Sequence, residues 1–278
     1  MKRRLFVVLG LCALLSAVVA PKAFAQAGAS DSFKIGIAPH TSARVIIEQY
    51  QPVRMALQNA LGMPVEILTA PDFTEFARRA LNQEYDLAVT TGHQARLFET
   101  DAAYLPLLTY QADFKSVVVV PNEGAKKPED LNGSTVIGLS PSSLVTIWGE
   151  HWLKVNNITS TVRYVSAADS VAQLMLAGEA QAGLMSLANF QGLSAETRAK
   201  LRFLVESDPL AGRVYMLNGR RAALLEKLRQ TLFAFSQAPE GRQYFDSTKL
   251  VGYRLLKPNE LQIMDPYADV VRQVLKAK

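Results

Sequence analysis

Hydroxyl and histidine side chains gather at three points of the sequence. Residues 39–42 read Pro-His-Thr-Ser, residues 90–93 read Thr-Thr-Gly-His, and residues 140–143 read Ser-Pro-Ser-Ser, with Thr146 one helical turn further on. Short hydroxyl side chains donate hydrogen bonds and let the backbone come close to a ligand, which suits a tetrahedral anion. The residues that we predict to bind such an anion are His40, Thr41, Thr91, Gly92, His93, Ser140, Ser142, Ser143 and Thr146.

The same stretches have an ordinary structural explanation. Ser and Thr at the start of a helix are most often N-caps, and a single loop histidine is usually a polar surface residue. Three such stretches in one chain nevertheless favour a ligand-binding role for at least one of them. The pair Ser142-Ser143 is the strongest candidate, since residues 140–143 offer more donors than one cap needs. His40 and His93 would bind an anion more strongly if they were protonated.

Motifs for catalysis and for metal binding do not occur in this sequence. It contains no G-x-S-x-G, no G-x-x-x-x-G-K-[ST] and no H-E-x-x-H pattern. Its three histidines have no metal-ligand spacing, and its single cysteine, Cys12, lies in the amino-terminal leader. We therefore expect a protein that is not an enzyme and that holds neither a metal nor a cofactor.

The amino end has the pattern of a cleaved secretion signal. Residues 2–4 are basic, residues 5–20 carry no charge, and Ala-Phe-Ala at 23–25 predicts cleavage before Gln26. The alternative is a membrane anchor, for which an apolar run of about 16 residues is short. Cleavage removes four of the 30 basic residues and none of the 25 acidic ones, so the net charge falls from +5 to +1. The secreted protein therefore lacks the excess of basic residues that nucleic-acid binding usually requires. We expect it to be a monomer in the periplasm.

The three hydroxyl clusters need a scaffold that brings them together. Short β-rich runs alternate with amphipathic helical stretches, a pattern that predicts mostly parallel sheets flanked by helices. Pro52 predicts a kink or break in the first helix, and Asp72 and Asp169 are expected N-caps. The expected strands are 33–38, 65–68, 86–90, 104–110, 116–120, 135–139, 162–165, 180–185, 201–205 and 213–217.

Two candidate crossovers, 111–115 and 207–212, bracket the central block of the chain. They predict an α/β protein of two lobes with a two-segment hinge: residues 26–112 and 213–278 form one lobe, and residues 113–212 form the other. Ligands of parallel sheets bind beyond the carboxyl ends of the strands, where helix N-termini offer free N–H groups. The hydroxyl clusters follow such strands, so we expect them to face one another across a cleft between the lobes.

The sequence resembles the periplasmic phosphate/phosphite/phosphonate-binding proteins of ABC transporters, which have the type II solute-binding fold. The resemblance covers nearly all of residues 33–270. It rests on the order and spacing of several short segments, namely 34–39 (KIGIAP), 50–53 (YQPV), 61–65 (LGMPV), 84–88 (EYDLA), 127–133 (KPEDLNG) and 175–183 (MLAGEAQAG). The resemblance implies capture of a small oxyanion in the cleft between the lobes and delivery to a membrane permease.

In that family, a Ser/Thr-rich stretch at the start of a second-lobe helix holds the phosphonate oxygens. Ser142 and Ser143 match this position, while Leu144-Val145 interrupts the hydroxyl run and Ala168 replaces a histidine that is common in the family. These departures favour a smaller or different anion. Some relatives report oxyanions to membrane proteins, so the alternative is a sensory subunit for a histidine kinase or cyclase, and an enzyme on this fold is the remaining alternative.

Overall fold

The structure is a computed structural model that describes residues 32–277, so the expected leader at 1–25 lies outside the described residues. The strands are β1 (Phe33–Ile37), β2 (Val65–Leu68), β3 (Leu87–Thr91), β4 (Tyr104–Tyr110), β5 (Ser116–Pro121), β6 (Thr135–Gly138), β7 (Thr161–Tyr164), β8 (Ala182–Ser186), β9 (Leu201–Glu206), β10 (Arg213–Asn218) and β11 (Tyr253–Arg254). Every strand that the sequence predicts is present, with its ends shifted by a residue or two at most.

Helices alternate with these strands along the chain. The α-helices are α1 (Ala43–Leu61), α2 (Phe73–Leu81), α3 (Gly92–Asp101), α4 (Leu144–Val155), α5 (Ala168–Leu176), α6 (Leu187–Gly192), α7 (Ala195–Ala199), α8 (Leu225–Gln237), α9 (Pro239–Thr248) and α10 (Asp265–Lys276). Short 3-10 helices occupy Pro128–Leu131, Gly219–Leu224 and Gln262–Met264. None of the helices in the described part of the chain combines the length and the apolar character that crossing a bilayer would require.

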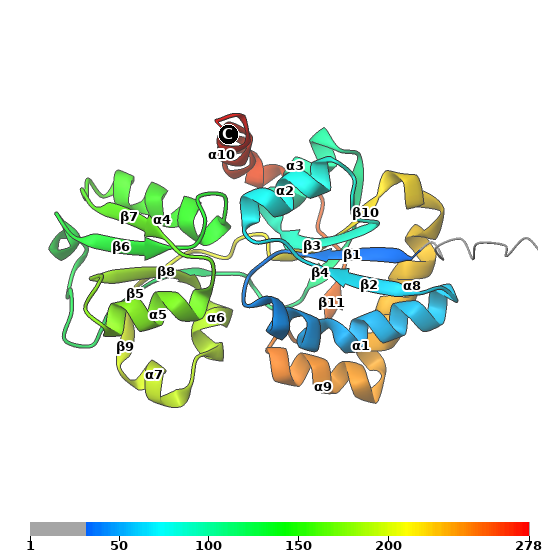
Figure 1. Cartoon of the computed structure of the whole chain (residues 1–278), viewed down its shortest axis with the longest axis horizontal. Coiled ribbons are helices and arrows are strands. Elements are labelled where there is room, and N and C mark those ends of the chain that lie inside the picture. Colours follow the sequence, from blue (N-terminus) through cyan, green and yellow to red (C-terminus); the bar gives the residue numbers. More distant parts are fainter. Residues whose placement is uncertain (1–31, 278) are drawn as a thin grey trace, which may run out of the picture. The chain divides into compact units, whose positions relative to one another are not determined.

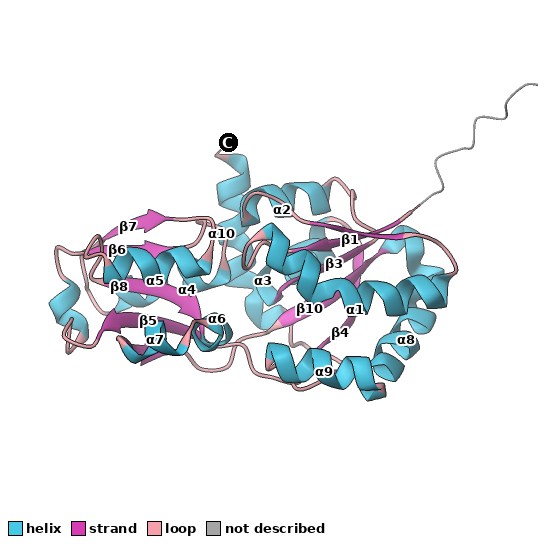
Figure 2. Cartoon of the chain, turned by 60° about the horizontal axis from the view of Figure 1, so that its bottom comes forward, coloured by secondary structure: helices cyan, strands magenta, loops and turns pink. Residues whose placement is uncertain are grey.

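The strands form two sheets, which confirms the predicted two-lobed α/β class (Figure 1). The first sheet has the order β11-β4-β10-β3-β1-β2, and the second has the order β7-β6-β8-β5-β9. Both sheets are mixed. The pairs β1–β2, β1–β3, β6–β7 and β6–β8 are parallel, whereas the pairs made by β10 and β5 are antiparallel. Helices flank the strands of both sheets (Figure 2).

The chain passes between the sheets twice, from β4 to β5 and from β9 back to β10. The two crossing segments are paired with each other: Phe114 and Leu210 form an isolated antiparallel bridge, and the Leu210 amide donates to the Phe114 carbonyl at 2.8 Å. Two adjacent crossing segments of this kind form a hinge about which two lobes can close on a ligand. The exact lobe boundaries at 112/113 and 212/213 remain our proposal.

Buried apolar residues hold each sheet to its helices. In β1, Phe33, Ile35 and Ile37 pack against one face of α1, including Tyr50 and Leu57, in a single buried cluster. Along α1 the buried positions recur every three or four residues, as an amphipathic helix requires. The carboxyl-terminal helix α10 packs on α3 and α2 beside the first sheet and also reaches α4 beside the second. This helix therefore contacts both lobes, whereas the lobe boundaries predicted from the sequence place it in the first.

Two local expectations need correction. Helix α1 continues through Pro52 without a break, because its buried face on either side of the proline holds both halves in one cluster. Helix α5 begins at Ala168 after the N-cap residue Ala167, so Asp169 lies in the first turn and is not the cap. A carboxylate in the first turn still interacts favourably with the positive end of the helix dipole.

Candidate functional site

A small cavity lies where loops of the two lobes meet. Its volume is about 20 Å³, and a single water molecule needs roughly 10–15 Å³ by the same measure. The lobes of this structure are therefore closed around little more than one water-sized space. The lining residues are His40, Phe73, Thr91, Phe114, Leu139, Ser143, Leu144, Val145, Ser186, Asn189 and Arg213.

A larger groove of about 490 Å³ shares His40, Asn189 and Arg213 with this cavity. Its other lining residues include Thr41, Glu48, Gln49, Ala168, Asp169 and Thr248. We call the cavity and this groove together the interlobe cleft. The cleft thus consists of a small cavity and a wider groove beside it.

Arg213 is the cationic side chain of the cleft. It is half-buried at the first position of β10 and also lines a hollow of about 260 Å³ beside the crossing segments. Among residues 32–277, no carboxylate forms an ion pair with Arg213. Arg220 and Arg221, a few residues further on, both contact Asp86 instead. A guanidinium without a carboxylate partner is the group that most often binds planar or tetrahedral oxyanions.

His40 presents an unpartnered nitrogen to the cleft. Its side chain is 8% exposed, and its Nδ1 lies 2.9 Å from the Ala38 carbonyl oxygen. Nε2 is buried and makes no hydrogen bond with any described residue. Burial, and secondarily the charge of Arg213, lower the pKa of His40 to about 3, so the ring is neutral at pH 7.

Two hydroxyls of the predicted clusters line the inner end. Ser143 is the N-cap of α4, where its Oγ accepts from the Thr146 amide at 3.4 Å and donates to Thr146 Oγ1 at 2.8 Å. Thr91 precedes α3, but its hydroxyl makes no cap and lies 3.1 Å from His93 Nδ1. Thr146 does not line the cavity, because its hydroxyl turns back to donate to the Leu139 carbonyl.

Another group of the predicted residues joins the lobes and does not line the cleft. Ser142 Oγ lies 2.7 Å from Thr74 Oγ1, and His93 Nε2 lies 2.9 Å from the Ser142 carbonyl oxygen. His93 and Ser142 are fully buried, and burial lowers the pKa of His93 to about 4. Ser140 Oγ is 3.4 Å from Ser142 Oγ. We call Thr74, His93 and Ser142 the clasp.

Gly92 is needed for close packing at the hinge. Its amide donates to the Ala211 carbonyl at 3.3 Å, so it is not free for a ligand in this closed arrangement. A Cβ at position 92 would lie 2.4 Å from the Ala211 Cβ. The structure thus brings His40, Thr91 and Ser143 to the inner end of the cleft and Thr41 to its outer groove.

Arg213, Ser186 and Asn189 are among the residues of the cleft that were not predicted from the sequence. Ser186 caps α6 by accepting from the Asn189 amide at 3.1 Å, and Asn189 Nδ2 donates across the cleft to the His40 carbonyl at 3.2 Å. Both residues follow an expected strand, as the three chosen clusters do, and the same rule could have found them. Arg213 directly follows the expected crossover at 207–212, which was a usable signal.

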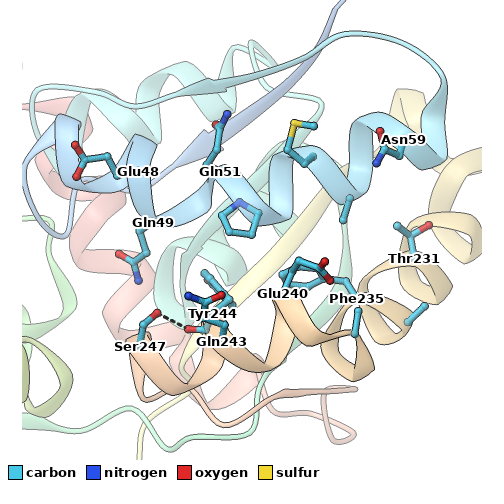
Figure 3. Close-up of a pocket in the computed structure, with 15 residues that line it drawn as sticks. Glu48, Gln49, Gln51, Asn59, Thr231, Phe235, Glu240, Gln243, Tyr244 and Ser247 are labelled. Carbon is cyan, nitrogen blue, oxygen red and sulfur yellow. Dashed lines mark hydrogen bonds between the residues drawn. The ribbon is translucent and has the colours of Figure 1, made fainter.

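A hollow that is larger than the groove of the interlobe cleft lies elsewhere. It has a volume of about 890 Å³ and is bordered by α1, α8 and α9 (Figure 3). Glu48, Gln51, Asn59 and Glu240 are among the polar groups around it, and its lining includes no Lys, Arg or His. A hollow with carboxylates and no cation does not suit an oxyanion. Within residues 32–277 there is also no cluster of three or more metal-ligating side chains.

Comparisons with known proteins identify the family and the fold of the chain. A family model described as "ABC transporter, phosphonate, periplasmic substrate-binding protein" matches residues 35–261. Among curated proteins, none matches this chain in sequence. Several solved structures share its type II periplasmic-binding fold.

One of them is PhnD1 from Prochlorococcus marinus in complex with methylphosphonate, with 12% identity, a TM-score of 0.77, and coverage of 88% of this chain and 98% of that one. Another is a binding-protein component of an ABC phosphonate transporter from Pseudomonas aeruginosa, with 14% identity, a TM-score of 0.73, and coverage of 89% and 94%. A third is XAC2383 from Xanthomonas citri bound to chloride, with 20% identity, a TM-score of 0.73, and coverage of 88% and 100%. At these identities the likeness shows the fold.

Proposed function

The chain belongs to the family of periplasmic substrate-binding proteins of phosphonate ABC transporters, and from this premise we propose that it captures a small oxyanion in the interlobe cleft and presents it to a membrane permease. This family binds substrates and is periplasmic. The ligand that we propose is a phosphonate, phosphite or phosphate-like anion. No feature of the described residues favours the sensory or the enzymatic alternative.

The unpaired guanidinium of Arg213 carries this proposal. A half-buried cation without a partner is costly, because it gives up part of its hydration and gains no ion pair in return. An oxyanion would supply the partner and could accept two parallel hydrogen bonds from the guanidinium. The Ser143 and Thr91 hydroxyls line the same cavity and offer further contacts to the anion.

The two lobes contribute different parts of the proposed site. His40, Thr91 and Arg213 belong to the segments around the first sheet, whereas Ser143 and Asn189 belong to those around the second. A ligand that contacts both sets stabilises the closed arrangement over an open one, since the open form offers only half of the contacts. We propose that closure on the ligand creates the surface that the permease recognises.

The width of the cleft supports a small head group with a modest substituent. The inner cavity of about 20 Å³ is too small for an anion as it stands, so the lobes must part slightly to admit one. The adjoining groove of about 490 Å³ leads outward past Thr41 and Gln49. A phosphonate would place its oxygens at Arg213 and direct its organic group into this groove.

A ligand screen tests the proposal. Thermal unfolding of the purified protein is followed with methylphosphonate, phosphite, phosphate, sulfate and acetate, each at a high concentration. A ligand at about 100 times its Kd adds roughly 2.7 kcal/mol of stability, and we expect at least one phosphorus oxyanion to do so. If none of them raises the unfolding temperature while the protein is folded, the proposed function is wrong.

The expected secretion signal and monomeric state stay predictions. Sequencing of the amino terminus of the protein recovered from the periplasm should begin at Gln26. A single species with the mass of one chain is expected in sedimentation, both with and without ligand. An uncleaved leader would make the protein a membrane-anchored receptor instead.

A further inference from the structure

His40 is a second unusual group of the interlobe cleft, beside Arg213. Its Nδ1 lies 2.9 Å from the carbonyl oxygen of Ala38. A carbonyl oxygen can only accept, so Nδ1 must carry the hydrogen of this bond. In the neutral ring, Nε2 then has a lone pair and no hydrogen. Nε2 is therefore a hydrogen-bond acceptor, and it is buried in the lining of both parts of the cleft without a partner.

The surroundings of the ring keep it neutral. Burial lowers its pKa to about 3, the charge of Arg213 on β10 adds to this effect, and the Ala38 carbonyl and Gln49 on α1 oppose it. The Tyr50 ring packs edge-on at a centroid distance of 6.2 Å, and Asn189 on α6 contacts only the His40 carbonyl. Glu48 and Asp169 line the outer groove and not the inner cavity. None of these groups lies within hydrogen-bonding distance of Nε2, and Gln49 is the side chain whose polar group comes close enough to the ring to raise its pKa.

The guanidinium of Arg213 and the unpartnered acceptor Nε2 of His40 line the same cleft, so together they restrict which ligand can bind. The guanidinium of Arg213 needs an oxygen with negative charge, whereas Nε2 needs an oxygen that carries a hydrogen. A fully deprotonated oxyanion meets the first need and would place an oxygen lone pair against the nitrogen lone pair. An oxyanion with one P–O–H group meets both needs, and an unmet buried acceptor weakens binding.

Given the oxyanion-binding function proposed above, we propose that His40 Nε2 accepts a hydrogen bond from a protonated ligand oxygen. The cleft then selects the singly protonated form of a phosphonate, phosphite or phosphate and rejects sulfate, which has no hydrogen to donate at neutral pH. His40 acts here as a residue that determines specificity, while Arg213 supplies charge recognition for both kinds of anion.

Calorimetric titrations with methylphosphonate and with sulfate at pH 5.5, 7 and 8.5 test this inference. We expect sulfate to bind at least about tenfold more weakly than methylphosphonate at pH 5.5, a ratio that corresponds to about 1.4 kcal/mol. We expect the affinity for methylphosphonate to fall by a similar factor towards pH 8.5, as the ligand loses its second proton. Heats in buffers of different ionisation enthalpy should show no proton uptake by the protein at pH 5.5.

The variant His40→Gln identifies the residue responsible. Its amide can both accept and donate, so sulfate should bind within a few-fold of methylphosphonate. His151→Gln, on α4 and outside the cleft lining, is the matched control and should keep the discrimination. If His40→Gln fails to fold, the wild-type comparison of the two ligands across pH still decides.

The outcomes separate this inference from the proposed function. Equal affinity for sulfate and methylphosphonate with no dependence on pH would overturn the role of His40 and leave oxyanion binding intact. Proton uptake on binding sulfate would also overturn it, because it would mean that His40 becomes a cation. If neither anion binds, the proposed function itself fails.

Discussion

At the scale of single residues, the arginines around β10 show how surroundings decide the role of a side chain. Arg220 and Arg221 hold the carboxylate of Asp86, whose side chain is only 2% exposed. Arg213 has no such partner and faces the interlobe cleft. The residue type is the same in all three cases, so the sequence alone does not distinguish a structural arginine from one that is available to a ligand.

Replacement of Arg213 by Met should remove ligand binding and leave the fold intact. The loss of a charged bidentate contact weakens binding by about 3 kcal/mol or more, which is over a hundredfold in Kd. Titration calorimetry measures the affinity, and urea unfolding measures the stability. Arg163→Met, at a position on β7 outside the cleft, is the control. Unchanged affinity in Arg213→Met would remove the basis of the proposed site.

Asp86 should matter for stability and not for binding. Burial alone would raise the pKa of Asp86, but the Lys34 amide and the Arg221 and Arg220 guanidiniums outweigh burial and hold it below the usual 3.8. The carboxylate thus stabilises the folded state above pH 3.8, and this contribution is lost as the pH falls through the lowered value. Its removal leaves two cations without their buried partner.

We expect Asp86→Asn to reduce the free energy of unfolding by about 3 kcal/mol at pH 7, and the difference from wild type should shrink below pH 3.8. Urea unfolding of both proteins across pH gives this difference directly. Asp246→Asn, at an exposed position of α9, should change stability little. A difference that stays constant down to low pH would contradict the assignment.

At the scale of elements, the start of α4 combines two tasks within consecutive residues. Ser143 caps the helix and lines the cleft, whereas Ser142 is fully buried and contacts Thr74 of the first lobe. Both serines stand in one predicted cluster. The direction of each side chain depends on its position relative to the first turn of α4. A prediction that places the helix start one residue too early therefore assigns the role of the capping serine to its buried neighbour.

Removal of the clasp contact should destabilise the closed arrangement of the lobes and thereby weaken ligand binding. Ser142→Ala and Thr74→Val each remove one partner of the 2.7 Å hydrogen bond between the lobes. A hydrogen bond contributes about 0.5–1.5 kcal/mol, so each variant should raise Kd by roughly two- to tenfold. The double variant should be no weaker than the worse single one, because both changes break the same bond. Fully additive losses in calorimetry would contradict a shared contact.

The sequence predicts the elements well where their apolar patterns are clear. All the strands of the two sheets except β11 were expected, because each is a short apolar or β-branched run. Helix α9 was not expected, although Pro239 at its first turn is a typical start signal. The short helices α6 and α7 lack a pattern that spans several turns. Of the kink or break predicted at Pro52, the break does not occur, because tertiary packing outweighs the local preference of one residue.

The sequence predicts less of the site. Its hydroxyl clusters do lie after strands, and His40, Thr91 and Ser143 reach the inner cavity. Whether a side chain is free for a ligand depends on partners that are distant in sequence. Ser142 has such a partner in Thr74, whereas Arg213 forms no ion pair with any carboxylate of residues 32–277. Such pairings follow from the order of strands in the two sheets, which local patterns do not fix.

At the scale of the whole molecule, the position of β10 connects fold and function. This strand brings the chain back from the second sheet into the middle of the first, so its first residue, Arg213, stands at the hinge. If the proposed ligand binds there, it contacts one of the two segments that connect the lobes. The antiparallel pairing of Phe114 with Leu210 joins the two crossing segments at this point.

The central claim is that the lobes close on an oxyanion at Arg213. A crystal structure of the protein with methylphosphonate tests it most directly. We expect the phosphonate oxygens within about 2.7–2.9 Å of the Arg213 guanidinium nitrogens, with one oxygen against His40 Nε2 and the methyl group towards the outer groove. A ligand bound in the hollow between α1, α8 and α9, or an Arg213 side chain turned to solvent beside the bound ligand, would contradict the claim.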